Sequence, residues 1–135
     1  MKRSFLLILL LLFAVCGFLA VSDNTRGAEI ELEGSEIYTE AELRAAANVV
    51  LRRFRHFPAR LERLWYDEER CIKEREYFSA QYDAEDVLVL MSDFTANKGK
   101  TTHNSGFEPG RQYTNWTWVL VRNDGGAWQL KTYGY

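Results

Sequence analysis

The chain has 135 residues, with 17 lysines and arginines against 19 aspartates and glutamates, so its net charge is −2 at pH 7. A chain of this length forms one domain around a single core, and its slight acidity argues against nucleic acid as a partner. Of its two cysteines, Cys16 lies in the leader described next. We therefore expect no disulfide in the mature chain and a buried, unreactive Cys71.

The first 22 residues have the pattern of an export signal. Lys2 and Arg3 precede a continuous apolar run over residues 5–15, and the small residues Ala20 and Ser22 stand at the two positions that a signal peptidase reads. The pattern predicts a signal peptide over residues 1–22 and a secreted or extracytoplasmic protein.

Two alternatives keep the leader attached. Residues 5–21 are at the short end of the about 20 apolar residues that span a bilayer, so a membrane anchor over residues 5–21 is the first alternative. Lipidation of Cys16 is the second, although Val15 stands where that signal has a small residue. Cleavage is favoured because the small-residue site is intact.

Residues 23–37 are acidic and contain few apolar side chains. The glutamates 29, 31, 33 and 36 are separated by small residues, with isolated apolar positions at Ile30 and Leu32. The composition predicts a flexible, solvated tether, with a brief strand over residues 28–32 as the weaker alternative. The folded domain is then expected over residues 38–135.

An amphipathic helix is predicted after Thr39. Thr39 and Glu42 form a capping box, and apolar residues follow at spacings of three and four: Leu43, Ala47, Val50, Leu51, Phe54 and Phe57. Pro58 should end this helix, which would be about five turns long. Its opposite face carries Arg44, Arg52, Arg53 and Arg55.

The next elements alternate between strand and helix. Residues 61–66 are expected to form a short strand, and Asp67 with two glutamates opens a second helix that reaches Tyr82. Residues 87–91 are continuously apolar, as in a strand covered on both faces, and the strand continues to Phe94.

A long polar segment and a hairpin complete the chain. Residues 96–112 contain three glycines and a proline and are expected to form a mobile loop. Residues 113–122 and 127–133 alternate as two strands, and residues 123–126 read Asn-Asp-Gly-Gly, which is a strong turn signal.

This order of elements predicts an α+β fold, in which a long helix near the N-terminus packs on a curved antiparallel sheet. Together with the segments Leu64-Trp65-Tyr66-Asp67, Ser92-Asp93-Phe94 and residues 114–128, it resembles the cystatin-like, nuclear-transport-factor-2-like (NTF2-like) superfamily. More closely, it is similar to a group of small exported bacterial proteins of unknown function. The resemblance implies the fold and an extracytoplasmic location, but it implies no activity.

Two types of site follow from these residues. The arginines 52, 53 and 55 form a basic helix face that can bind an anionic partner or the envelope surface. Enzymes of the superfamily place a carboxylate and a tyrosine in the open cone between helix and sheet, and this resemblance makes Asp93 with Tyr66, Tyr82 or Tyr113 the candidates for an isomerase or dehydratase.

No cofactor or metal is expected. Gly99-Lys100-Thr101 matches the end of a phosphate-binding loop, but the first glycine and the following helix of that motif are missing. His56 and His103 are the only histidines and have no partner at ligand spacing. The sequence thus favours a non-catalytic module that binds a protein or a small ligand at the bacterial envelope. The cone-pocket enzyme and an envelope-associated module held by the arginine face are the alternatives.

Overall fold

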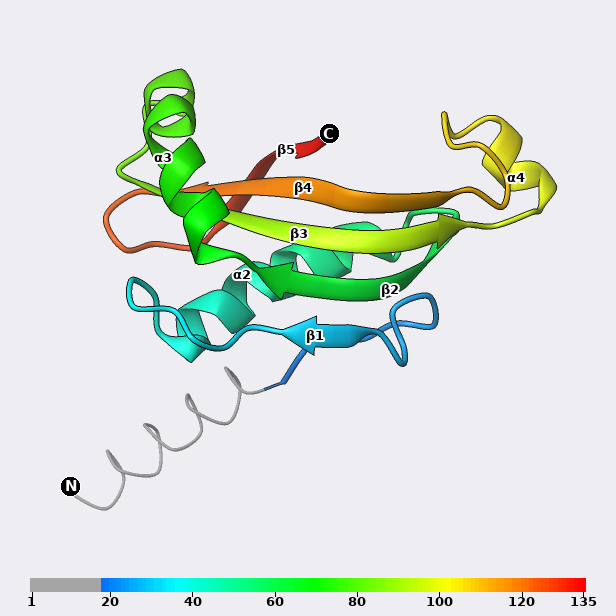
Figure 1. The fold of residues 1–135 in the computed structure, drawn as a ribbon, viewed down its shortest axis with the longest axis horizontal. Helices are drawn as coiled ribbons and strands as arrows, with labels where there is room; N and C mark the ends of the chain where they lie inside the picture. Colours follow the sequence, from blue (N-terminus) through cyan, green and yellow to red (C-terminus); the bar gives the residue numbers. More distant parts are fainter. Residues whose placement is uncertain (1–17) are drawn as a thin grey trace, which may run out of the picture.

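The computed structural model describes residues 18–135, so most of the expected leader and Cys16 lie outside the described residues. One sheet has the strand order β1-β2-β3-β4-β5, with β1 parallel to β2 and every other neighbouring pair antiparallel. The strands span Glu29–Glu31 (β1), Ala59–Tyr66 (β2), Asp86–Ala96 (β3), Gln112–Arg122 (β4) and Gln129–Gly134 (β5). The helices span Glu40–Phe54 (α2), Glu68–Tyr82 (α3) and Lys100–His103 (α4). The expected α+β class is therefore present (Figure 1).

Helix α2 begins as its sequence predicts and ends earlier. The capping box is formed, since Thr39 Oγ1 accepts a hydrogen bond from the Glu42 backbone while the Glu42 side chain accepts one from the Thr39 backbone. The helix ends at Phe54, and Phe57 lies in the following turn. There, Asn24 donates hydrogen bonds to the carbonyl oxygens of Phe54 (2.9 Å) and Phe57 (3.2 Å). The side chain of Asn24 thus adds hydrogen bonds to carbonyl oxygens at and just beyond the end of the helix, where the regular bonding pattern stops.

The two long helices cover opposite faces of the sheet. Trp118 in β4 contacts Phe54 of α2, whereas the next residue, Val119, lies beside Phe78 of α3. Successive strand residues point to opposite faces, so α2 and α3 lie on different sides, as Figure 1 also shows. The interior between α2 and the sheet is filled by fully buried side chains, among them Leu51, Phe54, Leu90, Phe94 and Trp118. Cys71 is fully buried on the α3 side, as expected.

The segment expected to be a solvated tether instead contacts the domain. Residues 29–31 form β1, which pairs with β2 in the register Ile30 to Leu64, and Leu32 is buried. The carboxylate of Glu68 at the start of α3 accepts hydrogen bonds from Ser35 Oγ and from the Glu36 backbone. The weaker alternative, a brief strand over residues 28–32, therefore describes this segment better.

The end of the chain follows the expected pattern with local changes. Residues 123–126 form a turn after β4, with positive φ at Asp124 (55°) and Gly125 (63°), as a type I′ turn requires. Strand β5 begins only at Gln129, two residues later than expected. The polar segment 96–112 contains the short helix α4 and an aromatic anchor, Phe107, which packs against the core. No helix within residues 18–135 is long and apolar enough to span a membrane.

Candidate functional site

Aromatic side chains gather where the C-terminal end of α2 meets the segment after α4. Rings from α2, β3, β4, β5 and the two adjoining turns contact one another over centroid distances of 5.0–6.4 Å: Phe54, Phe57, Phe94, Phe107, Tyr113, Trp116, Trp118 and Tyr133. The surface of this cluster contains a hollow with a volume of about 450 Å³. We call this the aromatic hollow; its lining is His56, Phe57, Pro58, Ser105, Gly106, Phe107, Trp116 and Tyr133.

A second hollow adjoins the first along α2. It has a volume of about 560 Å³ and lies between α2 and the edge strand β5. We call it the basic groove; its lining is Val49, Arg52, Arg53, His56, Leu130, Lys131 and Tyr133. His56 and Tyr133 border both hollows, so the aromatic and basic surfaces adjoin at these two side chains. We call the two hollows together the depression.

The positive charges of the basic groove lack carboxylate partners. Arg52 donates a hydrogen bond to the carbonyl oxygen of Asn48, and Arg53 donates one to Tyr133 Oη over 3.2 Å while its guanidinium lies 5.7 Å from the centre of that ring. Among residues 18–135, no aspartate or glutamate pairs with Arg52, Arg53 or Lys131. No acidic residue lines the groove either.

The structure separates the three arginines of the predicted basic face. Arg52 and Arg53 line the groove, whereas Arg55 follows the last residue of α2 and directs its Nε toward His56 Nε2, 3.4 Å away. Arg55 is therefore an internal comparison for the other two, because it has the same charge close by but does not line the groove.

The structure does not bring Asp93 together with the three tyrosines. Asp93 accepts a 2.9 Å hydrogen bond from the backbone of Asn115, where β4 is irregular and Asn115 has a φ of 55°. Phe94, the next residue, faces α2, so Asp93 points to the opposite face. The side chain of Asp93 thus stabilises the irregular part of β4. It lines neither the aromatic hollow nor the basic groove.

The tyrosines proposed as its partners lie at three separate places. Tyr66 is buried at the end of β2 and donates to Glu68, and burial raises the pKa of its phenol. Tyr82 stacks on Phe78 in α3. The hydroxyl of Tyr113 accepts a hydrogen bond from the Glu108 backbone. Each of these side chains thus has a structural contact of its own.

A polar network lies at the N-terminal end of α2. Arg122 is ion-paired with Glu42 and, over 3.0 Å, with Asp86, and its guanidinium lies 4.2 Å from the centre of the Trp128 ring. Tyr38 Oη lies 2.5 Å from Asp86 Oδ1 and 2.7 Å from the Val87 carbonyl oxygen. Burial, followed by the hydrogen bond to Asp86, raises the pKa of Tyr38. These contacts join α2 to the ends of β3 and β4, and every charge has a partner.

Sequence reasoning missed most of the depression. His56, Phe107, Lys131 and Tyr133 come from separate segments that only the fold brings together. One local signal was available, because Phe107 is a lone large aromatic residue in a polar, glycine-rich stretch. Such a residue is expected to pack against something.

No family model, curated protein or solved structure matches the chain. The described part of the chain also contains no group of three or more histidine, cysteine, aspartate or glutamate side chains that could hold a metal ion. The function must therefore be argued from the depression itself.

Proposed function

We propose that this protein is an exported, non-catalytic binding module, and that the aromatic hollow and basic groove together hold a ligand with an apolar body and an anionic group. One observation carries the proposal: an aromatic surface and an uncompensated cationic surface share His56 and Tyr133 as a common border. Depressions with apolar walls and a few polar groups are the usual form of ligand sites.

Each part of the depression has a physical role in this proposal. Phe57, Phe107 and Trp116 offer half-buried rings against which a flat or apolar group gains contact area. The buried Nε1 of Trp116 has no hydrogen-bond partner among the described residues. The cations of the groove attract an anion without first having to break an ion pair.

Within the α+β class, we propose that the fold is of the cystatin-like, NTF2-like type. The support is the packing of the buried stripe of α2 on one face of a largely antiparallel sheet that ends in a hairpin. In this arrangement the depression lies at the edge of the helix–sheet interface, and the interior itself is filled by side chains.

The binding proposal is tested by titrating the protein with 8-anilinonaphthalene-1-sulfonate, which joins aromatic rings to one anionic group. We expect saturable binding at one site. Reversing the charge in Arg53→Glu should weaken binding about tenfold, and the same change in Arg55→Glu should leave it within about twofold. The uncharged analogue N-phenyl-1-naphthylamine should bind the wild type and both variants alike.

Two results would contradict this proposal. One is the absence of saturable binding to the native protein, and the other is an equal loss of affinity in both arginine variants. Thermal melts of each variant are needed because this dye also binds loosened folds.

Export is tested separately from binding. Residues 1–22 are fused to an alkaline phosphatase that becomes active only outside the reducing cytoplasm, and a second fusion lacks residues 5–15. We expect activity in the first and none in the second. Equal activity from both would show that the apolar run does not direct export.

A further inference from the structure

Strand β5 is an open edge of the sheet. It is the last strand in the order, and it pairs with β4 alone. Within residues 18–135, no other hydrogen bond reaches its backbone. An edge of this kind presents a row of unpaired N–H and C=O groups to which a further strand can add.

The surroundings of β5 have the form of a strand-binding site. On one face, the basic groove runs between α2 and β5, with Arg52 and Arg53 on the helix and Lys131 on the strand. A groove between a helix and an edge strand suits an extended peptide, because main-chain bonds give affinity while alternate side chains enter pockets.

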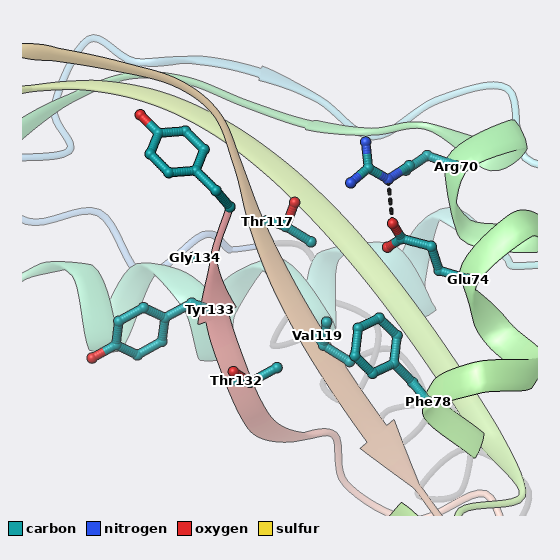
Figure 2. Close-up of a pocket in the computed structure, with 9 residues that line it drawn as sticks. Arg70, Glu74, Phe78, Thr117, Val119, Thr132, Tyr133 and Gly134 are labelled. Atoms are coloured by element: carbon teal, nitrogen blue, oxygen red, sulfur yellow. Dashed lines mark hydrogen bonds and ion pairs between the residues drawn. The ribbon is translucent and has the colours of Figure 1, made fainter. Parts of the chain in front are cut away.

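The opposite face of the same edge is also hollowed. Figure 2 shows Glu74 and Phe78 projecting from α3 toward Thr132 of β5, while the side chain of Tyr133 points away from α3. This hollow between α3 and β5 is small, about 120 Å³. Its charged residues already pair, with Arg70 Nε 2.6 Å from Glu74 Oε1. An added peptide strand would therefore place small polar side chains on this face and acidic or aromatic side chains in the basic groove.

We propose that the edge of β5 takes an extended acidic peptide from a partner protein, which adds as a further strand with its carboxylates toward Arg52, Arg53 and Lys131. The inference rests on the proposed function, since it uses the same groove and names the class of ligand. Adjacent strands lie about 4.8 Å apart and alternate their side chains, so every second residue of the peptide would face the cations.

Charge favours such a peptide over a second copy of the chain. Pairing of β5 with the β5 of another copy about a two-fold axis would bring two basic grooves together, and like charges at an interface are costly.

The test uses a capped six-residue peptide that alternates threonine and glutamate, added to the isotope-labelled protein and followed by amide chemical shifts. We expect shifts centred on residues 129–134 and on Arg52 and Arg53. A peptide in which lysine replaces glutamate should bind at least about tenfold more weakly. The Arg53→Glu variant should likewise lose binding, and Arg55→Glu should retain it.

Backbone methylation separates strand addition from simple charge attraction. Two further peptides carry N-methyl groups either on every glutamate or on every threonine, and both keep the same charge. Only one set of N–H groups faces β5 in an added strand, so one methylated peptide should bind like the parent and the other should lose about tenfold or more.

Other outcomes would overturn the inference in distinguishable ways. Equal binding of both methylated peptides would mean that the groove holds an anion without strand addition, which leaves the proposed function intact. Absence of binding by the peptides and by the naphthalenesulfonate probe would remove both proposals. A dimer detected by sedimentation, with cross-links between the β5 strands of its two copies, would mean that this edge binds a second copy of the chain and not a peptide.

Discussion

Trp118 donates a 2.8 Å hydrogen bond from Nε1 to Ser92 Oγ in the interior between α2 and the sheet, where both side chains are fully buried. The two residues lie on neighbouring strands, β4 and β3. A polar pair in an apolar interior is tolerated because each group satisfies the other.

Removing the serine hydroxyl should therefore destabilise the fold. Ser92→Ala leaves the indole N–H of Trp118 buried without an acceptor, and we expect the free energy of unfolding to fall by about 1–3 kcal/mol in urea titrations. A double-mutant cycle with Trp118→Phe is the control. The serine change should cost much less in the Trp118→Phe background; an equal cost in both backgrounds would mean that the hydrogen bond contributes nothing.

The ion pairs of Arg122 should matter more than those at the surface. Arg122 is 15% exposed and its partners Asp86 and Glu42 are 23% and 29% exposed. Arg122→Gln therefore leaves the partly buried Glu42 without its cation and leaves Asp86 with Arg75 alone, 3.6 Å away. We expect a loss of about 2 kcal/mol in the free energy of unfolding. Arg26→Gln breaks an exposed pair with Asp23 and should cost less than about 0.5 kcal/mol. Similar losses in the two variants would contradict this ranking.

Acid should destabilise the protein through Glu42 and Glu68. Burial opposes ionisation of Glu42, but hydrogen bonds from Thr39 and Arg122 outweigh it and lower its pKa. The pKa of Glu68 is lowered by the hydrogen bonds from Ser35 and from the backbone of Glu36. A pKa below the unfolded value adds stability that is present above the unfolded pKa, near 4.5, and is lost as the pH falls through the folded pKa.

The melting temperature should therefore fall from about pH 5 downward. Glu68→Gln removes one of these carboxylates, so the fall between pH 6 and pH 3 should be smaller than in the wild type. Glu33→Gln changes an exposed side chain and should keep the wild-type profile. A Glu68→Gln profile that parallels the wild type would show that this carboxylate is not a source of the pH dependence.

Asn24 should stabilise the domain from outside its helices. It binds the carbonyl oxygens of Phe54 and Phe57 at the end of α2, and it lies just after the expected cleavage site. Asn24→Ala should lower the free energy of unfolding by about 1 kcal/mol. Asn97→Ala, at an exposed position, should change it by less than about 0.5 kcal/mol. If Asn24→Ala left the free energy of unfolding unchanged, water would be replacing the side chain at these carbonyls.

Local patterns predicted the regular elements of this protein well. Thr39 and Glu42 marked the start of α2, the continuous apolar run marked β3, and Asn-Asp-Gly-Gly marked the hairpin, because each signal depends on residues close in sequence. Strand β1 gave a weak signal, because three residues cannot establish a period and its pairing partner in β2 is distant in the chain. The length of α2 was overestimated, since apolar spacing extends to Phe57 whereas the helix does not.

The site was far less predictable than the elements. Arg52 and Arg53 were identified as a basic face, but nothing in their spacing separates them from Arg55, which lies outside the groove. Asp93 was selected by chemical type and strand position; its bond to Asn115 depends on an irregularity in β4 that residue alternation does not reveal. Lys131 and Tyr133 acquire their role only through the placement of β5 beside α2.

The most direct test of ligand binding in the depression is an amide chemical-shift titration of the protein with 8-anilinonaphthalene-1-sulfonate. We predict that the shifts cluster on residues 52–57, 105–107 and 130–133, the segments that border the aromatic hollow and basic groove. Saturable shifts confined to the other end of α2, around Asp86 and Arg122, would contradict this account, as would no saturable shifts at all.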